Sequence, residues 1–246
     1  MKIDLAIIGG SGLYQFKGLE DIERHVMDTP FGKPSGDIVT GLFAGKRLAF
    51  LARHGESHSV PPHRVNYRAN VWALHQLGAQ SVIGVNAVGG IRDDMGPRAV
   101  VVPDQIIDYT HGRLSSYCDV DGAKVEHIDF SYPYTSDLRE ELVAAAGRAG
   151  IECVDGGCYG ATQGPRLETV AEITRMRRDG CDLVGMTGMP EAGLARELGV
   201  RYACLALVAN WAAGCGDEGE ISIEEIFAHL EHATANVAPI IRHLVA

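Results

Sequence analysis

The chain has 246 residues, of which 46% are hydrophobic and 22% charged, as in folded globular proteins and unlike disordered or fibrous ones. Its 22 Lys and Arg against 32 Asp and Glu give a net charge of -10, which disfavours nucleic acid and anionic membrane surfaces as partners. No apolar run approaches the ~20 residues that span a bilayer and no secretion signal is evident, so we expect a cytoplasmic protein. The six cysteines contain no C-x-x-C pair, so we expect reduced thiols.

Short runs of β-branched and apolar residues alternate with helical patterns along the chain. The runs predict strands at 3–8, 47–52, 81–85, 99–107, 153–161, 182–186 and 202–209. Capping residues and terminal glycines predict helices at 66–77, 168–179 and 190–198, and another from 222 onward. No repeat, low-complexity tract or Pro/Ser-rich linker divides the chain. The sequence therefore predicts a single α/β domain over residues 1–246.

The last predicted helix has a clear start signal, because Ser222 and Glu225 have the spacing of a capping box. Pro239 is predicted to kink this helix. The residues predicted to face the core from it are Ile226, Phe227, Leu230, Val237 and Ile241. Two stretches without periodicity, 111–133 and 212–220, are predicted to form a mobile lid or a contact between subunits.

Small and polar residues follow immediately after several of the predicted strands. They are Gly9-Gly10-Ser11-Gly12, Arg53-His54-Gly55, Asn86-Ala87, Met186-Thr187-Gly188 and Asn210. In open α/β sheets, ligands bind beyond the carboxyl ends of the strands. Hydroxyls, a guanidinium and exposed backbone N–H groups at that edge predict a pocket for a small oxyanion such as phosphate.

Each motif taken alone also has a plainer interpretation. Gln15 stands at the third glycine position of G-x-G-x-x-G, so a dinucleotide-binding oxidoreductase is disfavoured, and the glycines could simply form a tight turn. Arg53 could be an ion-pairing surface residue beside a structural His54. His54, His58 and His63 lack the spacing and the acidic or thiol neighbours of a metal site, so we predict no metal.

Several motifs, in order along nearly the whole chain, resemble the trimeric nucleoside phosphorylase family, especially its methylthionucleoside phosphorylases. They are Ile7 to Leu13, Ala52 to Gly55, Val65 to Asn70, Gln163 to Arg166, Met186 to Glu191, and Asn210. The resemblance implies a mixed central sheet flanked by helices and a homotrimer. It also implies phosphorolysis of a purine nucleoside in purine salvage, with inorganic phosphate as co-substrate and no cofactor.

The same resemblance implies roles for individual residues. Met186 is expected against the ribose. Asn210 is expected to donate to O6 and accept from N7–H of a 6-oxopurine, and Glu168 to accept from N1–H. Adenine-specific relatives carry an Asp-x-Asp pair where this chain reads Asn210-Trp211-Ala212, so Trp211 and Ala212 are expected beside the base. The residues expected around phosphate are Ser11, Arg53, His54, Asn86, Ala87 and Thr187.

The expected 5′ end of the nucleoside site is apolar. Ile223 matches a position that is His in relatives preferring a 5′-hydroxyl, and Ile221 and Ile226 flank it, although core packing of the helix start is a competing interpretation. His127 resembles a histidine that a neighbouring subunit contributes to this end. These positions predict methylthioinosine as the best substrate. The alternatives are a methylthioadenosine phosphorylase, a general 6-oxopurine nucleoside phosphorylase, a hydrolytic nucleosidase and a non-catalytic nucleoside-binding protein.

Overall fold

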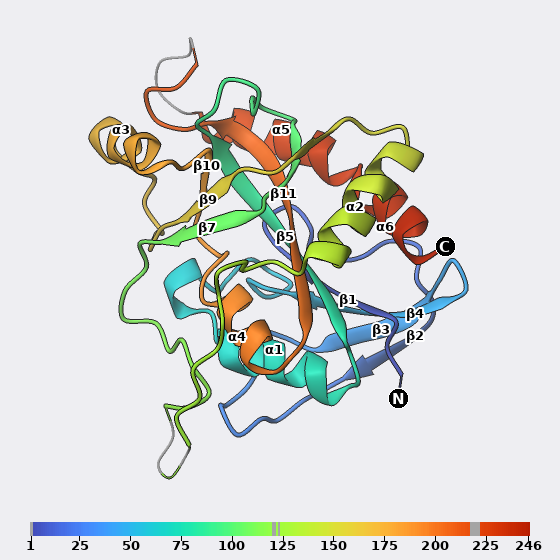
Figure 1. Ribbon diagram of the computed structural model, residues 1–246. Helices are drawn as coiled ribbons and strands as arrows, with labels where there is room; N and C mark the ends of the chain where they lie inside the picture. The colour runs from blue at the N-terminus through green and yellow to red at the C-terminus, as the bar shows by residue number, and fades with distance from the viewer. Residues whose placement is uncertain (1, 120–121, 123, 217–221) are drawn as a thin grey trace.

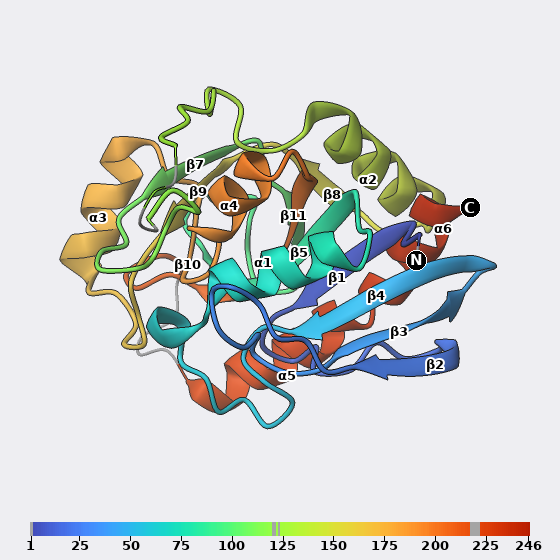
Figure 2. The same cartoon turned by 90° about the horizontal axis from the view of Figure 1, so that it is seen from below.

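The computed structural model describes residues 2–119, 122, 124–216 and 222–246. Across these residues the strands join in one mixed sheet, with helices on both of its faces (Figures 1 and 2). The strands are β1 (Leu5–Gly9), β2 (Glu20–His25), β3 (Ile38–Phe43), β4 (Lys46–Ala52), β5 (Ser81–Gly90), β6 (Val100–Val102), β7 (Gln105–Asp108), β8 (Cys153–Asp155), β9 (Cys158–Ala161), β10 (Leu183–Gly185) and β11 (Arg201–Trp211). The helices are η1 (Pro62–Arg64), α1 (Tyr67–Gln76), α2 (Ser136–Arg148), α3 (Val170–Asp179), α4 (Glu191–Glu197), α5 (Ile223–Thr234) and α6 (Val237–Val245).

Strand β5 is the centre of the sheet and sets the position of the site. It pairs in parallel with β1 and β11, and β1 pairs in parallel with β4, so the carboxyl ends of these four strands share one edge. Strand β10 runs antiparallel to the last part of β5, with Val184 opposite Gly89. Because β10 runs toward the middle of β5, the residues that follow β10 lie beside Asn86 in β5.

The two faces of the sheet bury separate hydrophobic clusters, which is why the central strands are apolar throughout. Successive side chains of a strand point to opposite faces. Leu5 and Ile7 pack in the cluster that contains residues of α2, α5 and α6, whereas Ala6 and Ile8 pack in the cluster that contains residues of α1 and α4. A third cluster holds α3 near β10. Figure 2 shows the helices distributed around the sheet in this way.

Helix ends follow the predicted capping chemistry closely. The side chain of Asn66 accepts a hydrogen bond from the backbone of Ala69 and starts α1. Helix α3 starts slightly later than predicted because Thr169 and Glu172 form a capping box, and Gly180, with φ of 97°, ends it. Among the described residues, no helix is long and apolar enough to cross a membrane.

Among the predicted strands, the largest differences from the observed bounds occur at 99–107, at 153–161 and at the end of β5. The strand predicted at 99–107 is divided at Pro103, which has no N–H to donate to a neighbouring strand. The strand predicted at 153–161 is divided at Gly156 and Gly157, whose φ values of 94° and 121° are incompatible with a continuing strand. Strand β5 runs on to Gly90, beyond the predicted end.

The prediction of one kinked C-terminal helix is wrong. Two helices, α5 and α6, replace it, and Pro239 lies in the first turn of α6, where a missing N–H costs no helical hydrogen bond. Phe227 is 52% exposed and therefore does not face the core, contrary to prediction. Leu230, Val237 and Ile241 are buried as predicted.

Candidate active site

A cavity of about 380 Å³ lies beyond the carboxyl ends of β1, β4 and β11 and beside the last part of β5. Helix α5 and the loop after β4 close its other sides. Its lining includes many of the residues predicted from the sequence, namely Ser11, His54, Ala87, Glu168, Met186, Thr187, Asn210 and Ala212. The sheet topology therefore gathers segments as distant in sequence as Ser11 and Asn210 around one small-molecule cavity.

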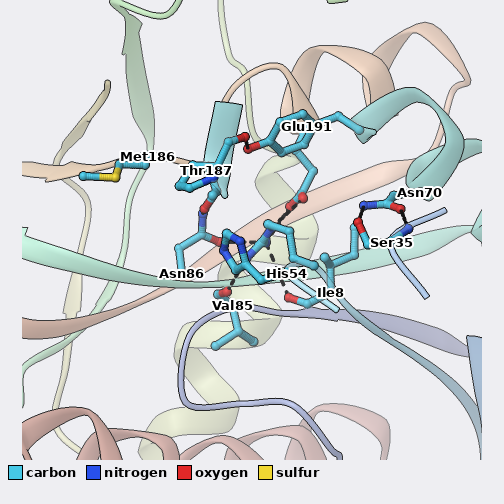
Figure 3. A network of polar contacts seen from close by, with 12 residues as sticks. Ile8, Ser35, His54, Asn70, Val85, Asn86, Met186, Thr187 and Glu191 are labelled. Atoms are coloured by element: carbon cyan, nitrogen blue, oxygen red, sulfur yellow. Dashed lines mark hydrogen bonds and ion pairs between the residues drawn. The ribbon is translucent and has the colours of Figure 1, made fainter. Parts of the chain in front are cut away.

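Asn86 orients the hydroxyl of Thr187 without lining the cavity itself. The Asn86 side chain is fully buried, and its Nδ2 donates to Thr187 Oγ1 at 2.9 Å (Figure 3). Since Oγ1 accepts this bond, the hydroxyl proton of Thr187 remains available to an acceptor in the cavity. The side chain of Ser11 supplies a second hydroxyl to the same cavity.

Arg53 lies behind the cavity and not on its surface. Its side chain is fully buried, and Nη1 donates to the carbonyl oxygen of Val85 at 2.9 Å. A Cβ atom placed on Gly10 would lie 2.6 Å from that oxygen and 3.0 Å from Nη1, so only glycine permits this close approach. The alternative of a surface arginine is therefore wrong, and the backbone of Gly10 separates the guanidinium from the cavity.

The charge of Arg53 is already paired within the protein. Its Nε and Nη2 each lie 2.7 Å from a carboxylate oxygen of Glu191, which is also fully buried, and Tyr202 donates to the same carboxylate at 2.7 Å. Burial opposes the charged form of Arg53, but the charge and hydrogen bonds of Glu191 hold its pKa above the usual value. Among the residues described, the cavity lining contains no Lys or Arg. An anion bound there would meet neutral donors in front of a buried ion pair.

His54 is 4% exposed and its environment keeps it neutral. Burial, with a smaller effect of the nearby Arg53 charge, lowers the pKa of His54 to about 4. Its Nδ1 lies 2.8 Å from the carbonyl oxygen of Val60. A carbonyl only accepts, so Nδ1 carries the proton and Nε2 of the neutral ring is an acceptor.

A β-bulge determines how Asn210 meets the cavity. Along β11, Val208 pairs with Val88 and Asn210 with Gly89, so Ala209 is the extra residue. The Nδ2 of Asn210 donates to its neighbour's carbonyl oxygen at 2.6 Å, which fixes the amide plane. The second N–H of Nδ2 and the oxygen Oδ1 of this half-buried side chain are available to a ligand.

Glu168 presents a carboxylate to the same cavity. The hydroxyl of Thr162 donates to Glu168 Oε1 at 2.6 Å, which leaves the second carboxylate oxygen without a hydrogen-bond donor among the described residues. Glu168 precedes the first residue of α3 by two positions, near the positive end of the helix dipole. Asn210 and Glu168 thus place amide and carboxylate groups around one cavity.

Comparison with known proteins decides the family. A family model of the Phosphorylase superfamily matches residues 4–246. The chain belongs to the phosphorylase superfamily. It is 58% identical over 243 residues to a probable S-methyl-5'-thioinosine phosphorylase of Xanthomonas campestris, covering 99% of this chain and 97% of the relative.

Two other relatives of this phosphorylase are informative. A 6-oxopurine nucleoside phosphorylase of Pyrococcus furiosus is 45% identical over 215 residues, covering 85% of this chain and 80% of the relative. The structure of a methylthioadenosine phosphorylase from Schistosoma mansoni in complex with adenine superposes with a TM-score of 0.92 and 32% identity, covering 99% of this chain and 91% of the other. The predicted family and its fold, a mixed sheet flanked by helices, are confirmed.

Some residues predicted for the substrate site do not reach the cavity of this phosphorylase. Trp211 is the neighbour of Asn210 on a strand, so its side chain points to the other side and packs against Gly96 and Gly216. Trp211 therefore does not line this cavity, and its expected place beside the base stays a prediction. His127 is exposed between β7 and α2 and does not line the cavity.

Part of the predicted 5′ wall lies outside the described residues. This holds for Ile221 and for the side chain of Ile223, the first residue of α5. Ile226 is the part of that predicted wall that the structure describes in full, and it lines the cavity together with Phe227 and Leu230 of α5.

Several residues around the cavity of this phosphorylase were not predicted from the sequence. The loop that follows β4 lines it with His58, Ser59, Val60, Pro61 and Pro62. A Pro-Pro pair shortly after a strand end was a usable signal of a rigid wall. Glu191 also had no assigned role, and an acid in the first turn of α4 followed by Ala, Gly, Leu and Ala was a weak local sign of its buried ion pair.

Proposed function

We propose that the protein catalyses phosphorolysis of S-methyl-5'-thioinosine, giving hypoxanthine and 5-methylthioribose 1-phosphate. The observation that carries this proposal is that Asn210 and Glu168 share one cavity with the hydroxyls of Ser11 and Thr187 and with the apolar side chains of α5. The 58% identical Xanthomonas campestris relative, a probable S-methyl-5'-thioinosine phosphorylase, supports the choice of substrate. Release of hypoxanthine that depends on phosphate, with the sugar 1-phosphate as second product, tests it.

In the proposed reaction, a phosphate oxygen forms a bond to C1′ while the bond from C1′ to N9 breaks and the purine leaves with the electron pair. Ser11, Thr187 and the main chain at Ala87 hold the phosphate, and Arg53 acts from behind Gly10. The negative phosphate stabilises the positive charge that develops on the ribose. Met186 packs against the ribose, and Asn86 keeps the Thr187 hydroxyl directed toward the phosphate.

His54 has a specific part in this proposal. Because its Nδ1 proton is committed to Val60, the free Nε2 accepts a hydrogen bond from the remaining hydroxyl of HPO₄²⁻. The other oxygens of the phosphate then face the donors Ser11 and Thr187. This arrangement favours the singly protonated phosphate dianion, which is abundant at neutral pH.

Asn210 and Glu168 select the base in this proposal. As the C1′–N9 bond breaks, the leaving purine gains negative charge and takes a proton from water at N7. The amide of Asn210 donates to O6 and accepts from this N7–H, and the free oxygen of Glu168 accepts from N1–H. Adenine has an amino group in place of O6 and no proton on N1. Each polar group left unpaired in the site costs ~1 to 3 kcal/mol, so a 6-oxopurine is preferred.

The 5′ end separates the proposal from its strongest alternative, a general 6-oxopurine nucleoside phosphorylase like the Pyrococcus furiosus relative. Ile226, Phe227 and Leu230 offer only apolar surface to the cavity. A methylthio group fits such a surface, whereas the 5′-hydroxyl of inosine would lose hydrogen bonds to water. Comparing kcat/KM for inosine and methylthioinosine decides between the two functions.

We further propose that the protein is a homotrimer in which a neighbouring copy covers the 5′ end with the segment around His127. On that segment, Leu114, Val125, Ile128 and Tyr132 expose large apolar side chains, which supports its burial against another chain. Light scattering of the active enzyme tests this proposal. An active monomer contradicts it.

A further inference from the structure

The guanidinium of Arg113 has all five of its N–H donors engaged by one compact set of acceptors. Nη1 donates to the carbonyl oxygens of Met186 and Met189, at 2.9 and 2.6 Å. Nη2 donates to the carbonyl oxygens of Thr162 and Gln163, at 3.1 and 2.9 Å. Nε donates to the side-chain oxygen of Gln163 at 3.1 Å.

These acceptors belong to two chain segments, each of which contributes other residues to the lining of the cavity. The turn from Met186 to Met189 follows β10 and carries Thr187, which is expected to bind phosphate. The residues Thr162 and Gln163 follow β9 and lead to Glu168, and the hydroxyl of Thr162 holds the Glu168 carboxylate at 2.6 Å. Arg113 therefore ties the wall expected to bind phosphate and ribose to the wall expected to bind the base.

Arg113 has no other evident use for its charge. No carboxylate forms an ion pair with it within the part of the chain that the structure describes, and it does not line the cavity. Its remaining contact is with Tyr67 of α1, where Cζ lies 5.4 Å from the ring centroid and Nη1 lies 3.2 Å from the hydroxyl. The cation thus serves to organise backbone carbonyls.

The segment that carries Arg113 is itself attached to the helices beneath it. Tyr117 donates its hydroxyl to the carbonyl oxygen of Arg68 in α1, and its backbone N–H donates to Glu197 in α4. In Figure 1 this segment runs from the end of β7 past α4 and α1. Its contacts fix the direction from which Arg113 enters between the two walls.

We propose that Arg113 is a positioning residue that sets the spacing between the Met186–Thr187 turn and Glu168, so that both walls engage one nucleoside. The roles of Thr187 and Glu168 and the identity of the substrate rest on the proposed function. Because phosphorolysis needs the nucleophile and the leaving group aligned, a shift of about 1 Å between the walls costs about a hundredfold in rate. Lysine has three donors and no planar fork, so it cannot hold the same set of carbonyls.

The experiment compares R113K and R113A with R139A, a matched control. Arg139 also holds backbone carbonyls, those of Pro103 at 2.8 Å and Val102 at 3.0 Å, but does not line the cavity. We expect both Arg113 variants to lose about a hundredfold in kcat/KM for the purine nucleoside that the wild type cleaves best. R139A should lose stability toward urea but keep activity within about threefold of the wild type.

A second readout separates positioning from general destabilisation. Guanidinium ion at low millimolar concentration should restore part of the turnover of folded R113A, whereas sodium chloride of equal ionic strength should not. If R113A does not fold, the kcat/KM of R113K decides. Wild-type activity of R113K, or equal losses in R113K and R139A, overturns the proposal. A wild type that prefers another purine nucleoside contradicts the proposed substrate and leaves this test intact.

Discussion

Arg53 and Glu191 form an ion pair in which both side chains are completely shielded from solvent, with two N to O distances of 2.7 Å. Removing two charges from water costs several kcal/mol for each ion. Tyr202 and the carbonyl oxygen of Val85 offset part of that cost by hydrogen bonding to the pair. Gly10 lies between this ion pair and the cavity. The expected phosphate site therefore has a fixed cation, Arg53, behind it, and the carboxylate of Glu191 largely balances the charge of that cation.

Replacing Glu191 by Gln leaves the charge of Arg53 buried without a counterion. We expect E191Q to lose about 3 to 5 kcal/mol of unfolding free energy in phosphate-free buffer. Saturating phosphate should stabilise E191Q more than the wild type, because the bound anion becomes the counterion and binds only the folded state. Urea unfolding with and without phosphate measures both effects.

The matched control is E172Q, because Arg166 and Glu172 form a bidentate pair on the surface at 2.8 and 2.9 Å. Exposed pairs contribute about 1 kcal/mol or less, and a Gln at position 172 still offers an oxygen to the capping-box N–H of Thr169, so E172Q should change little and gain no extra stabilisation from phosphate. Equal stabilisation by phosphate in E191Q and the wild type would contradict the coupling of the buried pair to the phosphate site.

Removing both members of the pair separates folding from phosphate binding. R53M alone leaves Glu191 charged and unpaired, whereas the double variant R53M/E191L replaces both ions by apolar side chains and is expected to be more stable than R53M by at least ~2 kcal/mol. The double variant still lacks the guanidinium, so its KM for phosphate should rise about a hundredfold. Phosphate kinetics like those of the wild type would show that Arg53 acts only in folding.

His54 makes stability depend on pH in a defined direction. In the unfolded chain its pKa is near 6.5, and in the fold burial lowers the pKa to about 4, so the unfolded state binds the proton more readily between these values. The stabilisation is present above pH 6.5 and is lost as pH falls toward 4, by about 2 kcal/mol between pH 7.5 and 5.

Urea unfolding in phosphate-free buffers measures the effect of His54. H54N keeps a donor for the Val60 carbonyl oxygen but does not titrate, so its loss of stability over the same pH range should be smaller by about 2 kcal/mol. Parallel pH profiles of H54N and the wild type would mean that another group accounts for the dependence.

Those parts of the site that depend on neighbouring residues in the chain could be predicted from the sequence. Those that depend on contacts between distant positions could not. Residues at strand ends were predictable because the strands are apolar and the residues after them small or polar, as at Ser11 and Thr187. The ion pair of Arg53 with Glu191 joins positions 138 residues apart, and no local pattern connects them. Arg113 stands in a segment without periodicity, so only the folded chain reveals its acceptors.

The fold shows the same division between local and distant information. Gly180 and Asn66 marked helix ends correctly because capping depends on neighbours in sequence. Strand β2 escaped prediction because it is largely exposed and polar, and its strand geometry comes from pairing with β3. Which of Asn210 and Trp211 faces the cavity depends on the bulge at Ala209, and the sequence gives no sign of that bulge.

Two substitutions should shift the base preference from hypoxanthine toward adenine. N210D together with A212D places carboxylates where adenine-specific relatives carry an Asp-x-Asp pair, and both Asn210 and Ala212 line the cavity. We expect the ratio of kcat/KM for methylthioadenosine over methylthioinosine to rise at least about tenfold, because the acceptors then match the adenine amino group. An unchanged ratio in a folded variant would remove Asn210 from base selection.

The most direct test of the account is a single assay of purine release from methylthioinosine, methylthioadenosine and inosine, each with and without inorganic phosphate. We predict that methylthioinosine is cleaved fastest, that methylthioadenosine has a kcat/KM at least about tenfold lower, and that omission of phosphate abolishes release. Release without phosphate, or equal efficiency with methylthioadenosine and methylthioinosine, would contradict the proposed phosphorolysis or the proposed base selection, respectively.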